Sequence, residues 1–196
     1  MIKRCISLVF ALTLLWPGGL QAGFKEGVQH YEKEEFDRSI AEFRALADLT
    51  HIRSMFNLGV FYDLGLGIDE DPYKAAYWYA QAAERGDPRA QYNLGLVHMQ
   101  GKGVAQSYTE AEKWFLRAAL QDHAQAQHNL GIMYYEGLGR VEHNYEKGMQ
   151  WLHRAKINGF RKGRNDLNAF GLTVSQAEIY TESGWKGLVF PLTRND

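Results

Sequence analysis

Three asparagines at equal spacing are the side chains of this 196-residue chain best suited to binding a partner. Asn57, Asn93 and Asn129 are each followed by Leu-Gly, and 93 − 57 and 129 − 93 both equal 36. An amide carries both a hydrogen-bond donor and an acceptor, so a row of amides suits the backbone of an extended chain of unspecified sequence. The alternative is that each asparagine ties its own helix to a neighbour, because identical residues at one repeat position are often structural.

Other polar and aromatic side chains are candidate contacts on the same surface. Arg53 and Arg89 lie four residues before the first two asparagines, and their planar guanidinium groups suit carboxylates. For the remaining candidates the alternative is an ordinary solvated surface, since most exposed polar residues bind nothing in particular. These remaining candidates are Asp63, Tyr92, Gln100, Gln125, His128, Tyr135 and Glu136.

Catalytic, metal-binding and nucleic-acid-binding patterns are missing from the sequence. It contains no Gly-x-Ser-x-Gly and no His-Glu-x-x-His, and Cys5 is its only cysteine. The formal net charge of −1 does not favour nucleic acid as a partner, because nucleic acid is bound by a basic patch or stripe. We therefore expect no catalytic residues, no metal and no cofactor, and a protein or peptide as the partner.

Residues 1–22 are typical of a secretory signal peptide. Lys3 and Arg4 precede an apolar run over residues 5–16, and Ala22 supplies a small residue for cleavage. The run is too short to span a bilayer unaided. We predict export to a bacterial periplasm; the alternatives are secretion or the lumen of a secretory pathway. Membrane contact is expected only through partners or through a signal that stays uncleaved as an anchor.

A helical array with the same step of 36 must position these side chains. Glycine accepts the positive φ of a helix end, so each Gly-x-Gly pair predicts the stop of a first helix. Asp71-Pro72 predicts the start of a second helix, with Ser107 and Asn144 as the later N-caps. The glycine pairs are Gly65/Gly67, Gly101/Gly103 and Gly137/Gly139, and the second helices carry Trp78, Trp114 and Trp151, which are predicted core residues.

The repeat step divides the chain into five parts after the predicted signal. Full copies are predicted at 55–90, 91–126 and 127–163. Residues 23–54 read as an N-terminal partial repeat that caps the array, since terminal repeats are usually atypical. Residues 164–196 are predicted to hold C-terminal capping helices and an apolar tail from 184. That tail either docks on the array or binds a partner.

The order Asn-Leu-Gly, aromatic, Gly-x-Gly, Trp-aromatic and Ala-Ala resembles Sel1-like repeats, which are relatives of the tetratricopeptide repeat. His98 departs from the aromatic position, which Tyr62 and Tyr134 fill. The resemblance implies an all-α, right-handed α-α superhelix, a solenoid of helix-turn-helix repeats. It also implies a concave surface of first helices that binds proteins or peptides, and the repeated asparagine resembles a clamp residue that meets a peptide backbone.

We accordingly predict an exported scaffold or adaptor that is not an enzyme. One alternative is a hydrolase acting on β-lactams or cell-wall peptides, an activity linked to a cysteine-rich branch of the family. That branch carries a disulfide in each repeat, whereas the chain after residue 22 contains no cysteine. The other alternative is a structural component of an envelope assembly.

Overall fold

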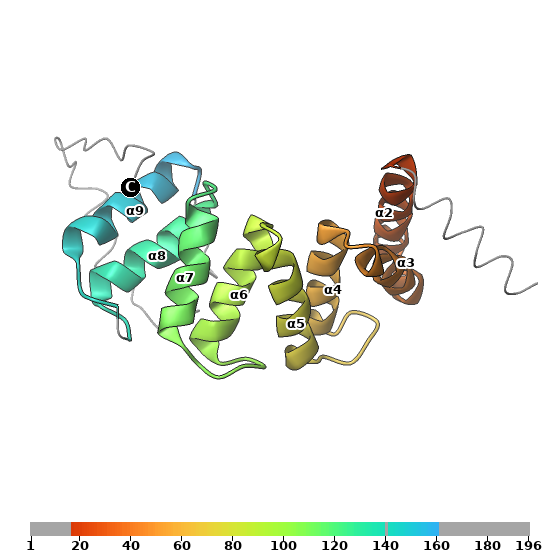
Figure 1. Ribbon diagram of the computed structural model, residues 1–196, viewed down its shortest axis with the longest axis horizontal. Helices are drawn as coiled ribbons and strands as arrows, with labels where there is room; N and C mark the ends of the chain where they lie inside the picture. The colour runs from red at the N-terminus through yellow and green to blue at the C-terminus, as the bar shows by residue number, and fades with distance from the viewer. Residues whose placement is uncertain (1–16, 140, 161–196) are drawn as a thin grey trace, which may run out of the picture. The chain divides into compact units, whose positions relative to one another are not determined.

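Every regular element in the part of the chain that the structure describes is an α-helix (Figure 1). The structure is a computed structural model that describes residues 17–139 and 141–160. The predicted all-α fold is confirmed, while the apolar run of residues 5–16 and the C-terminal helices and tail predicted at 164–196 lie outside the described residues. In chain order the helices are α2 (Pro17–Glu32), α3 (Phe36–Asp48), α4 (Ile52–Leu64), α5 (Pro72–Glu84), α6 (Pro88–Gln100), α7 (Tyr108–Ala119), α8 (Ala124–Glu136) and α9 (Tyr145–Ile157).

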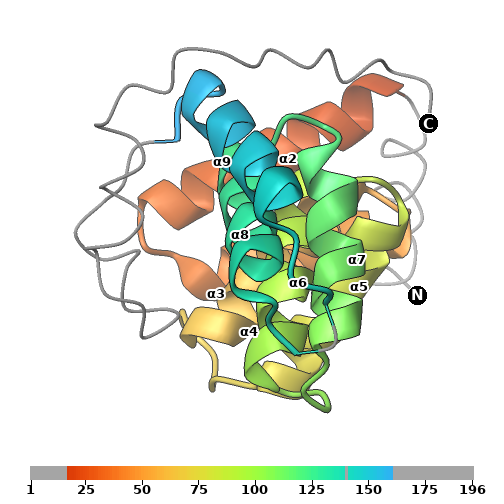
Figure 2. The same ribbon diagram turned by 90° about the vertical axis from the view of Figure 1, so that its left-hand side faces the viewer.

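The helices pack in pairs, and each pair contacts the next along the chain (Figure 1). The first and second helices of three copies are α4 with α5, α6 with α7, and α8 with α9, and α2 with α3 form a preceding pair. Helix contacts are concentrated between consecutive helices. This is the arrangement of a solenoid, in which each repeat touches only its neighbours. Figure 2 views the same array with α9 nearest the viewer.

The predicted helix starts and stops are confirmed within the described residues. Asp71 caps α5 by accepting a hydrogen bond from the Lys74 backbone N–H at 3.0 Å. Ser107 and Asn144 cap α7 and α9 in the same way, at 3.2 and 2.9 Å. Gly65 ends α4 with a φ of 63°, in the left-handed region that glycine enters without a steric penalty. The local sequence therefore sets the boundaries of these helices.

A glycine on each first helix lets a second-helix side chain lie directly against the helix backbone. A Cβ added at Gly59 would lie 2.5 Å from the Tyr79 ring, and one at Gly95 would lie 2.5 Å from the Phe115 ring. Real carbon atoms do not approach this closely. The glycine of the repeated Asn-Leu-Gly is therefore required for close packing of a first helix on its second helix.

The second glycine of each Gly-x-Gly pair packs against the preceding copy. A Cβ at Gly103 would lie 2.2 Å from the carbonyl oxygen of Pro72, the first residue of α5. The corresponding contacts join Gly67 to Phe36 and Gly139 to Tyr108, with Cβ–Cβ distances of 2.3 and 2.5 Å. Phe36 and Tyr108 are also first residues of second helices. Each glycine loop thus joins one copy to the copy before it.

Alanine and aromatic side chains of the second helices fill the space between the repeats. Ala75 and Ala83 on α5 are each 1% exposed. Trp114 and Trp151 are buried, and Trp78 is half-buried against the core. The predicted core position of the tryptophans is therefore confirmed, with Trp78 the least enclosed. Small residues between large ones let neighbouring helices pack closely.

Candidate functional site

The three asparagines occupy equivalent positions on α4, α6 and α8 but differ in accessibility. Asn57 and Asn93 are half-buried. Asn129 is only 5% exposed, and its Nδ2 has no hydrogen-bond partner among the described residues. The prediction that Asn129 offers its amide to a partner is therefore corrected, because protein encloses the side chain. Asn57 and Asn93 keep part of their surface in contact with solvent.

The residue on the neighbouring second helix distinguishes Asn93 from Asn129. Burial and the nearby Asp63 carboxylate raise the pKa of the Tyr79 hydroxyl, and a hydrogen bond with Asn93 opposes that rise. The residue 36 positions after Tyr79 is Phe115, which has no hydroxyl to offer Asn129. One missing oxygen atom therefore accounts for the unpartnered amide.

Asp63 is engaged in a polar network between two copies. Its carboxylate accepts hydrogen bonds from Lys102 Nζ at 2.8 Å and from the Tyr79 hydroxyl at 3.2 Å. Lys102 also pairs with Glu70 at 3.0 Å. The two carboxylates raise the pKa of Lys102. Asp63, predicted as a ligand contact, therefore joins α4 to α5 and to the loop after α6.

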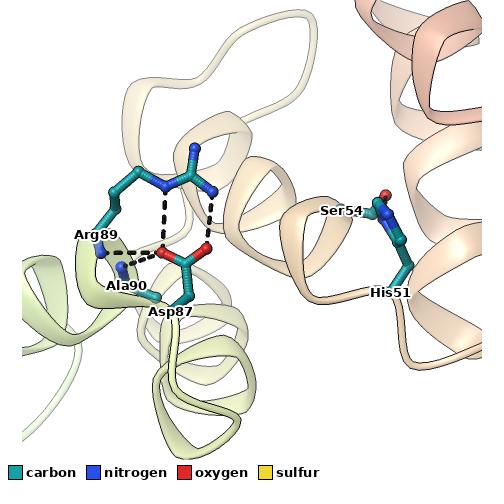
Figure 3. Close-up of polar contacts among 5 residues, drawn as sticks. All are labelled: His51, Ser54, Asp87, Arg89 and Ala90. Atoms are coloured by element: carbon teal, nitrogen blue, oxygen red, sulfur yellow. Dashed lines mark hydrogen bonds and ion pairs between the residues drawn. The ribbon is translucent and has the colours of Figure 1, made fainter. Parts of the chain in front are cut away.

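Arg89 is held by the carboxylate that caps α6. Asp87 accepts backbone hydrogen bonds from Arg89 and Ala90 at 2.9 and 3.1 Å, and side-chain bonds from Arg89 at 3.2 and 2.7 Å (Figure 3). Burial opposes the charge of Asp87, but these hydrogen bonds outweigh it and lower its pKa. The guanidinium carbon of Arg89 also lies 4.3 Å from the centroid of the Phe56 ring, within cation–π range. The carboxylate partner expected for Arg89 thus comes from its own chain.

Histidines occupy the corresponding N-cap positions of the other two first helices. His123 Nδ1 accepts a hydrogen bond from the Ala126 backbone N–H at 3.3 Å. His51 Nδ1 lies 2.9 Å from the Ser54 hydroxyl (Figure 3). Desolvation lowers the pKa of both histidines. Arg53 lowers the pKa of His51 further, whereas the Asp87 carboxylate partly opposes the lowering at His123. Both imidazoles are therefore favoured in the neutral form, which leaves a ring nitrogen able to accept.

Aromatic side chains one position before the asparagines contact residues that follow the paired second helix. Phe56 contacts the guanidinium of the next copy, as described above. Tyr92 stacks on His123 with 5.0 Å between ring centroids and 28° between planes. His128 stacks on Phe160 with 4.1 Å and 13°. Tyr92, predicted as a ligand contact, thus contacts the N-cap residue of α8, and His128, also predicted as one, contacts a residue that follows the end of α9.

The other predicted residues lie at the two ends of the first helices. Arg53 and Gln125 are exposed in the first turns of α4 and α8, and Gln100 and Glu136 are exposed at the last residues of α6 and α8. Tyr135 is half-buried, with its ring 5.5 Å from that of Tyr145. The structure therefore separates these residues into an amino-end group near the asparagines and a carboxyl-end group.

Two buried glutamines, absent from the sequence prediction, join successive copies. Gln91 and Gln127 donate to backbone carbonyls at the end of the preceding second helix, Ala83 and Ala119, at 3.1 and 2.9 Å. The two glutamines are 36 residues apart. That spacing is the signal by which the sequence could have identified them. Buried amides with satisfied donors favour a structural role at this repeat position.

The helix pairs match a known repeat. The sequence model of the Sel1 repeat matches residues 52–87, 88–123 and 124–160. The chain belongs to the Sel1 repeat family. Each matched range begins at the first residue of a first helix, at Ile52, Pro88 or Ala124. The ranges start three residues before the predicted boundaries at 55, 91 and 127.

Two solved Sel1-type structures are similar to this chain. A Sel1 repeat protein from Oxalobacter formigenes is 31% identical with a TM-score of 0.66, and the match covers 75% of this chain and 58% of that one. A protective antigen present in uropathogenic Escherichia coli strains, displaying an SLR fold, is 31% identical with a TM-score of 0.68, and the match covers 72% and 31%. The chain thus spans less than two thirds of the length of either protein. No curated protein matches its sequence.

Sel1 repeats commonly serve as scaffolds for protein interaction and are generally non-catalytic. Within residues 17–139 and 141–160, no three histidine, cysteine, aspartate or glutamate side chains gather as metal ligands would. No helix in that part of the chain is long and apolar enough to cross a bilayer.

Proposed function

We propose that this Sel1 repeat protein is an exported scaffold that binds an extended segment of a partner protein across α4 and α6. The observation that carries the proposal is the repetition of two accessible groups on consecutive first helices. Arg53 and Asn57 recur, 36 residues later, as Arg89 and Asn93. All four side chains retain solvent-exposed surface. Equivalent groups at a fixed step suit a partner whose own backbone repeats.

The two arginines have different tasks in this proposal. Arg89 is already paired with Asp87 at 2.7 Å. Arg53 is exposed, and the described residues place no carboxylate within ion-pair distance of it. Arg53 is therefore the residue we assign to an acidic group of the partner, and the amides of Asn57 and Asn93 to its backbone.

An affinity capture from bacterial envelope extract tests the amide contacts. We expect the chain to capture a partner that the double variant N57A/N93A fails to capture, because that variant lacks both accessible amides. The matched control is N129A, which removes the same side chain from the buried position and should capture the partner as the parent does. Circular dichroism must show that all three chains are equally helical.

Equal capture by N57A/N93A and the parent would contradict the proposal, since the amides would then be structural. Loss of capture in N129A alone would place binding at the other end of the array.

Export rests on the predicted signal peptide at 1–22. Phe24 on α2 contacts Phe43 and His51, with ring centroids 5.7 and 5.1 Å apart, and the Ser39 hydroxyl donates to the Gly27 carbonyl at 2.8 Å. These packing contacts all come from residues after the predicted cleavage position, so cleavage would preserve them.

Mass spectrometry of the chain expressed in a bacterium tests the export prediction. We expect a mature chain beginning at Gly23 in the periplasmic fraction. The variant L14R places a charge in the apolar run and should remain full-length in the cytoplasm, because a signal needs an uninterrupted apolar region. A full-length parent in the cytoplasm would refute export, and a full-length parent in the membrane fraction would indicate an uncleaved anchor.

A further inference from the structure

A groove with a volume of about 500 Å³ opens between α5, α6 and α7. This volume lies in the range of ligand-sized pockets. Tyr73 and Tyr77 line it from α5 and are 74% and 56% exposed, while Trp114 lines it from α7. His98 and Leu94 line it from α6. The three helices are neighbours in both views of the array (Figures 1 and 2).

The groove lies where the middle copy has an imidazole in place of the phenol of its neighbours. Position 98 is 36 residues from both Tyr62 and Tyr134. The Tyr62 hydroxyl accepts a hydrogen bond from Arg44 at 2.6 Å, and the Tyr134 hydroxyl donates to Glu112. In both neighbouring copies a phenol thus fills this position and bonds to the preceding second helix.

The residues around the phenol are also replaced in the middle copy. The position 36 after Arg44 is Ala80, and the position 36 before Glu112 is Ala76. Both alanines line the groove. Lys74 Nζ lies 5.3 Å from the centroid of the Tyr62 ring, and Lys147 Nζ lies 3.9 Å from that of Tyr134. The equivalent position of the middle copy is Glu110, which lines the groove. The middle copy therefore lacks the phenol, the residue that bonds to the phenol hydroxyl, and the lysine that lies over the phenol ring.

His98 lines this groove and carries an acceptor that the described residues leave unsatisfied. Its Nδ1 is enclosed and has no hydrogen-bond partner within the described part of the chain. Desolvation lowers the pKa of His98, although Glu110 and a hydrogen bond with the Ala105 backbone oppose this, so the ring is favoured as neutral. In a neutral imidazole, one nitrogen donates and the other accepts. With the Ala105 backbone taking the donor, Nδ1 is left as an acceptor without a donor.

We propose that this groove binds the tyrosine side chain of a partner protein segment, whose hydroxyl donates to His98. In the two neighbouring copies, Tyr62 and Tyr134 show that a phenol fits between a first helix and the preceding second helix. The exposed rings of Tyr73 and Tyr77 supply apolar walls. Glu84, Glu110 and Lys113 also line the groove. Lys113 pairs with Glu110 at 3.0 Å, which leaves the carboxylate of Glu84 to repel anions, so the ligand is a neutral phenol and not a phosphotyrosine. This site does not involve Asn57 or Asn93, although two of its lining residues, Leu94 and His98, lie on α6.

Titration of the full chain with N-acetyl-tyrosinamide, followed by NMR shifts of α5, α6 and α7, tests the proposal. We expect millimolar binding that shifts the His98 ring signals. N-acetyl-phenylalaninamide should bind about threefold to tenfold more weakly, since it lacks the hydroxyl and one hydrogen bond. The phosphotyrosine analogue should not bind. Equal binding of the tyrosine and phenylalanine probes, or shifts confined to other helices, would overturn the assignment.

Two substitutions fill the groove with the residues that stand at the equivalent positions of the neighbouring copies. His98→Tyr introduces the ring present at positions 62 and 134, and Ala80→Arg introduces the residue present at position 44. Both should fold and lose the tyrosine probe. Undiminished binding in both variants, with intact circular dichroism, would refute the site. The N57A/N93A variant should bind the probe as the parent does, so failure of the groove and failure of the first-helix proposal are distinguishable.

Discussion

Replacing Gly103 with alanine should lower the free energy of unfolding by about 2–5 kcal/mol. The glycine has a φ of +75°, and left-handed backbone costs other residues about 1–2 kcal/mol. Its added Cβ would lie 2.2 Å from the Pro72 carbonyl oxygen and 2.8 Å from the Tyr73 nitrogen. These are backbone atoms of α5 and cannot rotate away, so the two copies must separate. Urea unfolding followed by circular dichroism measures the loss.

Gly86→Ala is the matched control for this substitution. Gly86 has a φ of +94°, but a Cβ there would meet nothing within 4 Å. The control therefore carries the backbone strain without the steric clash, and its cost should stay near about 1–2 kcal/mol. Equal losses for the two variants would mean that the contact with Pro72 contributes nothing.

The sequence was sufficient to predict the helices but not the contacts between copies. Gly65 and the N-caps act on their own backbone within a few residues, so local sequence predicts them. The partner of Gly103 lies in the preceding copy, and a glycine motif alone does not identify it. The signal is present in the sequence, because Phe36, Pro72 and Tyr108 follow the same step as the three glycines. Comparing positions between copies would have predicted these contacts.

The candidate site was predictable as a row of positions but not as a set of accessible groups. Asn93 and Asn129 are both followed by Leu-Gly, yet Tyr79 neighbours the former and its equivalent, Phe115, has no hydroxyl. Arg89 is paired with Asp87, two residues before it. The residue two before Arg53 is His51, which offers no carboxylate. The accessibility of the asparagine and arginine side chains thus depends on residues that differ between the copies. The repeat pattern contains only the residues that the copies share, so it does not predict this accessibility.

Lowering the pH from 7.5 to 5.5 should destabilise the array through three histidines. Desolvation lowers the pKa of His51, His98 and His123 in the folded chain. The unfolded chain therefore binds more protons below about pH 6.5, and stability that is present above that value is lost as the pH falls toward the folded pKa values. Each proton contributes at most about 1.4 kcal/mol per pH unit, so three contribute at most about 4 kcal/mol per pH unit. Urea midpoints at pH 7.5, 6.5 and 5.5 measure the loss.

The variant H51N/H98Q/H123N identifies the groups responsible. Asparagine is a favourable N-cap residue, so the substitutions at 51 and 123 preserve helix starts while removing the titration. Its stability should stay nearly constant between pH 7.5 and 5.5. Below about pH 4 both chains should lose stability together, because Asp87 has a lowered pKa in the folded state and its contribution is lost on protonation. An equal loss in parent and variant above pH 5 would assign the acid sensitivity to other groups.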